Sequence, residues 1–206
     1  MIKLYCFPRS GNSREVKIVL AEKDLPYEPI DIRANPAVKE SIEFKKASPK
    51  GTVPALIDGD VYLSEAYDIN EYLNEKYPQN PLLPEDRKVR LEIFEWVKRY
   101  DKALCLRIGL LLIESLLKKP EDQKEEVKAK LRADIHRGMQ ELDEHLEKSG
   151  EYFFGVYTLA DVSMTPHLAA LHRVNIELGD ETANLKAWIQ RMQARPSFDI
   201  SARVGF

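Results

Sequence analysis

The sequence is poor in the features that mark secreted, membrane-spanning and disulfide-stabilised chains. It has two cysteines, Cys6 and Cys105, among 206 residues. We therefore expect reduced thiols and a cytoplasmic location. The longest apolar stretch, residues 103–117, is shorter than a bilayer requires and contains Arg107 and Glu114. It predicts a buried helix, and we expect no membrane partner.

The chain also lacks an excess of either charge, because its net charge is −3 at pH 7. Without a basic excess we expect no nucleic-acid partner. The first strand pattern begins at Ile2, so we expect no signal peptide. A content of 44% hydrophobic and 32% charged residues is ordinary for a globular protein, and 206 residues fit one large domain or two small ones.

The first 77 residues alternate between strand and helix patterns. The helix pattern at 13–23 puts Val16, Val19 and Leu20 on one face, and Pro29 favours an edge position for the second strand. Two apolar runs around Asp58-Gly59-Asp60 predict a hairpin. The predicted strands are 3–7, 27–32 and the two arms of the hairpin 53–65; the predicted helices are 13–23, 37–47 and 66–77.

A second, helical part follows a proline-rich linker. Residues 78–87 contain three prolines and end the preceding helix. Four helices are predicted beyond it: 88–118, 121–148, one that begins near Thr158, and 184–195. The expected organisation is an α/β domain at 1–77, a linker at 78–87 and an all-α domain at 88–206.

The stretch "YTLADV" (157–162) has the pattern of a capping box. Thr158 is the expected N-cap, and Asp161 follows three residues later, where a carboxylate reaches back to the N–H of the cap. Tyr157 and Val162 flank them as an apolar pair. We interpret this motif as structural.

Three places in the α/β part suggest ligand chemistry. Ser10 stands between the first strand and the first helix. Pro54 begins a strand, and a cis bond there would leave the N–H and C=O of Val53 free for an extended peptide-like ligand. Glu65 and Ala66 open the third helix, whose free N–H groups attract a carboxylate, while Glu65 can pair with an ammonium group.

These pieces, in this order, resemble the cytosolic glutathione S-transferases. The motifs that carry the resemblance are "SPKGTVPALIDGDVYLSEAYDINEYL" (48–73), the linker, "TLADVSMTP" (158–166) and "RPSF" (195–198). The resemblance implies a thioredoxin-like domain plus a helical domain, a homodimer, and detoxification chemistry with glutathione as co-substrate and no metal. The loop "FPRSGNSREVKI" is most similar to the serine-type classes: theta, zeta, phi and related bacterial forms.

The resemblance assigns Ser10 as the hydroxyl that donates to the glutathione thiolate. The alternative is that Ser10 only caps a helix, although we expect Ser13 to be the structural cap. Cys6 lies within the strand pattern, so we interpret it as a buried small hydrophobe and not as a nucleophile.

Further residues receive roles from the same resemblance. Glutathione is expected to contact Val53, Pro54, Glu65 and Ala66, and Lys50 is expected to reach its glycine carboxylate. Ala66 departs from the family, which usually has serine there, and the lost hydroxyl corresponds to about 10- to 100-fold in affinity. The electrophile is expected to contact Tyr100, Leu104 and Arg107, with Ile108 and Leu111 at the same helical spacing. Arg107 could instead pair with an acidic residue at a domain or subunit contact.

Two classes of function remain open at this point. The first is an enzyme that conjugates glutathione to a small hydrophobic electrophile, or a related isomerase, reductase or peroxidase. The second is a non-catalytic interaction protein, because "VKIVLAEKDLPYE" (16–28) also resembles stringent-starvation protein A. Ser10 and Glu65 favour the enzyme, and Ala66 favours the interaction protein.

Overall fold

The computed structural model describes residues 1–203, which form two compact units. Unit 1 holds residues 1–82 and the C-terminal segment from Arg195 onward, and unit 2 holds Leu83–Ala194. Among the described helices, none combines the length and the apolar character needed to cross a membrane.

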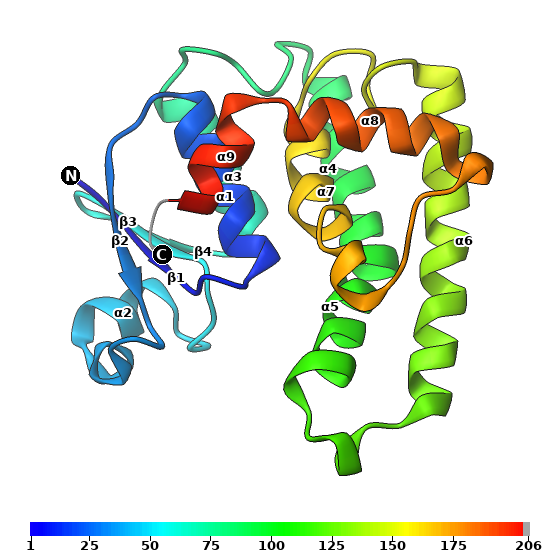
Figure 1. Ribbon diagram of the computed structural model, residues 1–206. Helices are drawn as coiled ribbons and strands as arrows, with labels where there is room; N and C mark the ends of the chain where they lie inside the picture. Colours follow the sequence, from blue (N-terminus) through cyan, green and yellow to red (C-terminus); the bar gives the residue numbers. More distant parts are fainter. Residues whose placement is uncertain (204–206) are drawn as a thin grey trace. The chain divides into compact units, whose positions relative to one another are not determined.

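Unit 1 contains a four-stranded mixed sheet (Figure 1), as predicted. Its strands lie in the order β2-β1-β3-β4, with β1 and β2 parallel and the other pairs antiparallel. Pro29 lies on the edge strand β2, where its missing N–H costs no central ladder bond. The expected hairpin is confirmed, since Asp58 pairs with Val61. The strands are β1 (Ile2–Cys6), β2 (Tyr27–Asp31), β3 (Ala55–Asp58) and β4 (Val61–Ser64).

Helices cover the sheet of unit 1: α1 (Gly11–Glu22), α2 (Ile42–Ala47) and α3 (Ala66–Lys76). Tyr5 and Ile57 pack with Phe44 of α2 in one apolar cluster. Side chains alternate along a strand, so the fully buried Leu4 and Leu56 point to the opposite face. The helix predicted at 37–47 is divided into a 3₁₀ turn (Pro36–Glu40) and α2, because Ser41 caps α2 by accepting from the Phe44 N–H.

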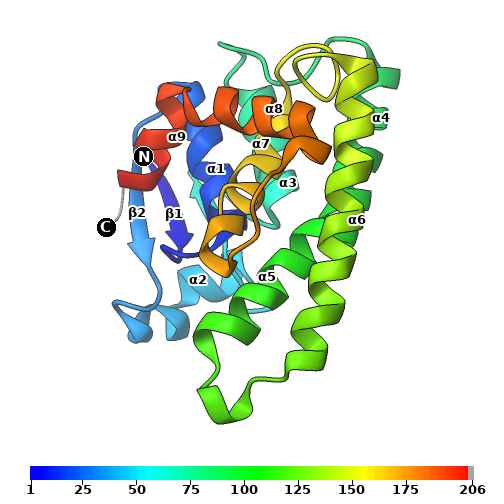
Figure 2. The same ribbon diagram turned by 45° about the vertical axis from the view of Figure 1, so that its right-hand side comes forward.

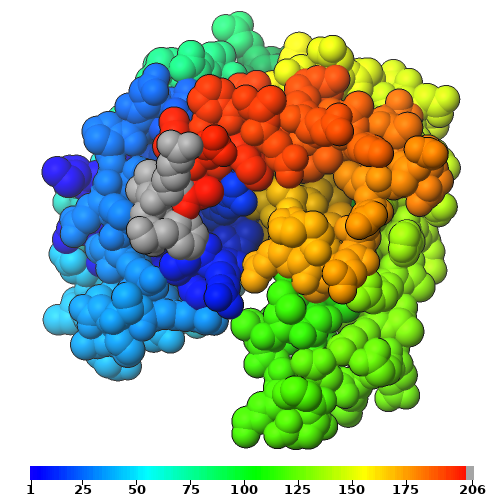
Figure 3. Space-filling view, in the orientation of Figure 1, coloured from blue at the N-terminus to red at the C-terminus, as the bar shows by residue number. Residues whose placement is uncertain are grey.

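The C-terminal helix α9 (Pro196–Arg203) packs beside α1 in unit 1, which Figures 2 and 3 also show. Arg195 and Ser197 both donate to the Glu22 carboxylate at the end of α1. Near the start of α1, the Arg14 guanidinium donates to Phe198 O and Ser201 Oγ, at 3.1 and 3.2 Å. The expected all-α domain ran to residue 206, whereas these contacts assign α9 to the unit that contains the sheet.

Unit 2 is helical. Its first long helix is interrupted by one π-helical turn, which rotates the faces of the following turns, and ends in a second π-helical turn. Buried side chains from several helices, including Leu104, Met139 and Trp188, form its core. The elements are α4 (Arg87–Tyr100), η2 (Asp101–Cys105), α5 (Leu106–Leu112), η3 (Ile113–Leu117), α6 (Glu125–Ser149), α7 (Leu159–Leu168) and α8 (Ala183–Gln193), with 3₁₀ turns at Pro120–Asp122, Leu171–Val174 and Asp180–Thr182.

The predicted capping box at the start of α7 is confirmed. Thr158 Oγ1 accepts from the Ala160 N–H, and Asp161 Oδ2 accepts from the Thr158 N–H at 2.9 Å. Asp161 Oδ1 also accepts from Trp188 Nε1 and from the Phe153 N–H. Burial raises the pKa of Asp161 to about 6, against the opposing effect of these hydrogen bonds. This carboxylate therefore joins three segments of unit 2.

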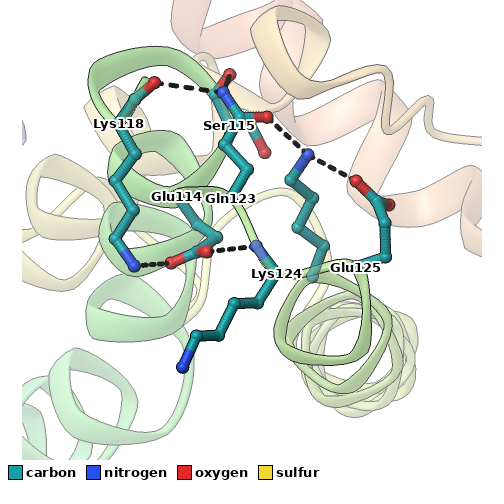
Figure 4. Close-up of polar contacts among 7 residues, drawn as sticks. Glu114, Ser115, Lys118, Gln123, Lys124 and Glu125 are labelled. Carbon is teal, nitrogen blue, oxygen red and sulfur yellow. Dashed lines mark hydrogen bonds and ion pairs between the residues drawn. The ribbon is translucent and has the colours of Figure 1, made fainter. Parts of the chain in front are cut away.

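A polar cluster closes the turn between η3 and α6 (Figure 4). The Glu114 carboxylate pairs with Lys118 at 2.6 Å and accepts from the Lys124 N–H at 2.8 Å. The hydrogen bond from Lys118, followed by the one from Lys124, lowers the pKa of Glu114. Gln123 adds hydrogen bonds to the carbonyls of Ser115 and Lys118. The cluster fixes the tip of this helical hairpin.

Candidate functional site

The topology of the sheet brings the candidate residues of unit 1 to one edge. Strands β1, β2 and β4 end at the edge where β3 begins, since Cys6 pairs with Asp31 and Ala55 pairs with both Tyr5 and Ser64. The segments that follow or precede these strands carry Ser10, Pro54 and Glu65. Four neighbouring strands are about 14 Å wide. An extended tripeptide of about 10–11 Å therefore fits along this edge.

Ser10, and not Ser13, is the N-cap of α1. Its Oγ accepts from the Ser13 N–H at 3.2 Å, while Ser13 is buried. Within residues 1–203 the hydroxyl proton of Ser10 has no acceptor. Ser41, which caps α2 at the same distance, instead donates its proton to Val38 O at 2.7 Å. Ser10 can therefore cap α1 and still donate a hydrogen bond to a ligand.

The peptide bond between Val53 and Pro54 is cis, as expected. Pro54 is buried directly before β3. In the described part of the chain, Val53 forms no backbone–backbone hydrogen bond. Its N–H and C=O thus remain available for pairing with an extended ligand at this edge.

Glu65 lies between β4 and α3 in the left-handed region, with φ of 74°. A non-glycine residue in this region carries about 1–3 kcal/mol of backbone strain, and such residues cluster at functional sites. No side chain caps α3, whose first residue Ala66 is buried. The N–H groups of this first turn suit an anionic group.

Lys50 pairs with Glu65, since its Nζ lies 3.0 Å from Oε1. The sequence placed these residues at opposite ends of glutathione, with Lys50 at the glycine carboxylate. The structure instead brings them together at the β4 end of the edge. Both side chains are largely exposed, at 76% and 57%, so the pair contributes little to stability.

The three residues expected to contact an electrophile have structural contacts in unit 2. Leu104 is fully buried and packs against Gly138, where an added Cβ would lie 3.0 Å from Leu104 Cδ1. Tyr100 is 4% exposed, with its ring 4.5 Å from that of Trp96. Arg107 Nε lies 3.4 Å from Asp134 Oδ2, so Arg107 pairs with an acidic residue of its own unit and not with one across a domain contact. A role for these three residues in substrate binding stays a prediction.

The same helix has a second apolar face that sequence reasoning missed. Four large side chains on it are 43–55% exposed, at spacings of four, three and four residues. The helix is apolar on nearly all sides here, so periodicity could not separate the buried face from the exposed one. This exposed face consists of Leu106, Leu110, Ile113 and Leu117.

Neither cysteine is placed as a nucleophile. Cys6 and Cys105 are buried free thiols, and burial raises the pKa of Cys6. A buried thiol that resists ionisation is a poor nucleophile, in agreement with the interpretation of Cys6 from the sequence. Among residues 1–203, no group of three or more His, Cys, Asp or Glu side chains is arranged to hold a metal ion.

Comparison with known families assigns both parts of the chain. Residues 4–81 match the family described as "Glutathione S-transferase, N-terminal domain". Residues 110–196 match "Glutathione S-transferase, C-terminal domain".

Individual relatives cover most of the chain. It is 34% identical to "Glutathione S-transferase Z2" of Arabidopsis thaliana over 86% of this chain and 80% of that protein. It is 30% identical to "Probable maleylacetoacetate isomerase" of Vibrio cholerae, over 95% and 92%. A stringent starvation protein A homolog of Haemophilus ducreyi is 28% identical over 92% and 84%. The structure of a Burkholderia graminis glutathione transferase with two glutathione molecules bound per subunit has a TM-score of 0.84, with 26% identity over 99% and 88%.

Proposed function

This chain belongs to the glutathione S-transferase family, and we propose that it activates the thiol of glutathione for attack on a small hydrophobic electrophile. The observation that carries the proposal is Ser10, which caps α1 and keeps its hydroxyl proton free at the edge shared with Pro54 and Glu65. A glutathione-dependent isomerisation uses the same activated sulfur and is supported by the zeta-class and isomerase relatives.

The energetics of thiol activation are within reach of these groups. Lowering a thiol pKa by about two units requires about 2.7 kcal/mol in favour of the anion. A hydrogen bond to a charged group contributes about 1.5–3 kcal/mol. The N-terminus of a helix adds about 0.3–2 kcal/mol. Ser10 and the start of α1 together supply the preference for the thiolate, and the thiol proton leaves to solvent.

The same edge orients the rest of the tripeptide. Val53 pairs with the backbone of the cysteinyl residue. The γ-glutamyl end carries both an ammonium and a carboxylate, and we assign it to the β4 end of the edge. Glu65 receives the ammonium, while Lys50 and the Ala66 N–H receive the carboxylate. Lys50 thereby replaces the hydroxyl that Ala66 lacks.

The electrophile needs an apolar surface, and the exposed face Leu106–Leu110–Ile113–Leu117 provides one on unit 2. Tyr100, Leu104 and Arg107 remain the residues that we propose for contact with the electrophile, and this exposed face is a further candidate surface of unit 2. We also propose that the chain forms a homodimer, as the family relationship implies. Sedimentation equilibrium of the whole protein tests this, and a monomer at micromolar concentration would overturn it.

The deciding experiment compares Ser10→Ala with Ser41→Ala. Both variants lose a similar N-cap, worth about 1 kcal/mol. We expect wild type and Ser41→Ala to show the ultraviolet absorbance of bound thiolate at neutral pH. Ser10→Ala should bind glutathione in a calorimetric titration and show no thiolate signal. Equal thiolate signals in both variants would contradict the role of Ser10.

A second candidate is a non-catalytic interaction protein, which Ala66 favours because the usual hydroxyl is missing. The same titration distinguishes it. If the wild-type chain binds no glutathione at several millimolar, the transferase proposal fails and a protein partner should be sought.

A further inference from the structure

The first turn of α1, which begins at Ser10, is weak by its own sequence. Gly11 and Asn12 open the helix, and both disfavour the helical conformation, glycine by about 0.8–1 kcal/mol relative to alanine. None of the residues 11–14 is acidic, so no carboxylate of this turn interacts with the positive end of the helix dipole. The position of Ser10 therefore depends on contacts between this turn and other parts of the chain.

Arg14 connects this turn to α9. Its backbone N–H donates to Ser10 O at 3.0 Å, which closes the first turn of α1. Its guanidinium donates to Ser201 Oγ at 3.2 Å and to Phe198 O at 3.1 Å. The guanidinium carbon also lies 4.1 Å from the centroid of the Phe198 ring. One residue thus bonds to Ser10 through its backbone and to the C-terminal helix through its side chain.

The face of α9 that receives Arg14 is shaped for this contact. Ser197 and Ser201, one turn apart, are 5% and 1% exposed, and their small side chains let α9 approach α1. Ser201 donates its own proton to Phe198 O at 2.7 Å, so its oxygen can accept from Arg14. Burial lowers the pKa of Arg14, while Asp199 of α9 opposes this effect. Two acceptors and a stacked ring together fix the orientation of the guanidinium.

The other end of the same contact holds α9 against the last turn of α1. Arg195 and Ser197 donate to the carboxylate of Glu22, the last residue of α1. The two helices are therefore antiparallel neighbours, as Figure 2 shows. Glu22 lies about 18 Å along the helix from Ser10, whereas Arg14 lies about 6 Å from it. Only the Arg14 end of the contact can act on the turn that carries the hydroxyl.

We propose that Arg14 is a positioning residue for Ser10: by binding α9, it holds the weak first turn of α1 where the Ser10 hydroxyl meets the glutathione sulfur. This inference rests on the proposed function and extends it to the C-terminal helix. Arg14 acts through the turn, since its guanidinium is already bound to α9. Without this contact the helix end frays, and a donor that is no longer fixed stabilises the thiolate less.

A matched pair of substitutions on α9 tests the proposal without changing α1. Ser201→Ala removes an acceptor of Arg14 and keeps the charge of Arg14. Ser197→Ala is the control, because it removes a buried hydroxyl from the Glu22 end of the same contact. Arg14→Gln removes the guanidinium itself. The readouts are the absorbance of bound thiolate against pH, and kcat and KM for glutathione in the conjugation of 1-chloro-2,4-dinitrobenzene.

We expect Arg14→Gln to raise the apparent pKa of the bound thiol by about one unit and to lower kcat at pH 7 by up to about tenfold. Ser201→Ala should change both in the same direction by a smaller amount, about threefold in kcat. The KM for glutathione should stay within about twofold, and Ser197→Ala should match the wild type. Adding Ser201→Ala to Arg14→Gln should cause no further loss, because both act through one contact.

Three results would overturn the proposal. An unchanged pKa of the bound thiol in Arg14→Gln and Ser201→Ala would show that the contact only stabilises the fold. A shift in Arg14→Gln alone would assign the effect to its charge. An equal shift in Ser197→Ala would assign it to the docking of α9 in general. If Arg14→Gln does not fold, the comparison of the two serine variants decides. Absence of the thiolate signal in the wild type would instead refute the proposed function, and this inference with it.

Discussion

Lys50 and Glu65 form an ion pair of 3.0 Å at the edge where β4 ends and α3 begins. Glutathione carries an ammonium and a carboxylate on its γ-glutamyl end. In the proposed complex, Glu65 pairs with the ammonium and Lys50 pairs with the carboxylate. Each of the four charges then keeps a partner of opposite sign. Under the proposed function, this exchange of partners would let a chain with Ala66 in place of the usual serine bind the tripeptide.

Removing either charge should weaken the binding of glutathione. We expect Glu65→Gln to raise the Kd by about 10- to 100-fold, because the ammonium loses a charge-assisted hydrogen bond. Lys50→Gln should raise it by about tenfold. The calorimetric Kd measures both effects. Lys45→Gln is the control, since Lys45 forms a comparable exposed pair with Glu40 at 2.7 Å. A Kd that responds equally to all three changes would contradict the assignment.

Restoring the missing hydroxyl should tighten binding. Ala66→Ser places a donor at the first residue of α3, and we expect the Kd for glutathione to fall by about tenfold or more. If Lys50 compensates for Ala66, the gain should be larger in the Lys50→Gln background than in the wild type. A double-mutant cycle measures this difference. An unchanged Kd in both backgrounds would place the γ-glutamyl carboxylate elsewhere.

A charge on the exposed apolar face should impair use of the electrophile and spare glutathione. We expect Leu110→Asp to lower kcat/KM for 1-chloro-2,4-dinitrobenzene by about tenfold or more, because an apolar ring would then meet a carboxylate. The Kd for glutathione should stay within twofold. Leu91→Asp is the control, as Leu91 is a 60% exposed leucine outside this face. Matching losses in the two variants would remove the face from the site.

The buried Asp161 should make the stability depend on pH. Its folded pKa of about 6 exceeds the ordinary value of 3.8, so the folded state binds the proton more tightly. The contribution of Asp161 to the free energy of unfolding is therefore largest below about pH 4 and falls as pH rises through about 6. Asp161→Asn should flatten this part of the profile.

The same substitution should lower the free energy of unfolding by about 1–3 kcal/mol at pH 7, since an amide N–H₂ cannot accept from the Thr158 N–H. Urea unfolding between pH 4 and 7 measures both, and a profile unchanged by the substitution would contradict this account.

Local sequence signals predicted the elements that depend on neighbouring residues. Alternating apolar runs around Gly59 specify the hairpin, and the spacing of Thr158 and Asp161 specifies the capping box, because each involves residues within a few positions. The motifs from Ser10 to Ala66 also pointed to the family that the comparisons then showed. The division of 37–47 at Ser41 and the identity of the α1 cap were harder to predict, since several serines near a helix start can serve as caps.

What the sequence by itself determined is the fold class, the family and the edge of the sheet that carries Ser10, Pro54 and Glu65, since these follow from local motifs and strand order. Only the tertiary structure decided which apolar face of residues 106–117 is buried, which partner Lys50 takes and which helix Arg14 contacts. These depend on contacts between residues distant in sequence, such as Leu104 with Gly138, or Arg14 with Phe198. The physical reason is that the sequence around an apolar or charged side chain does not indicate which distant residue it contacts. Packing and strand register determine that contact.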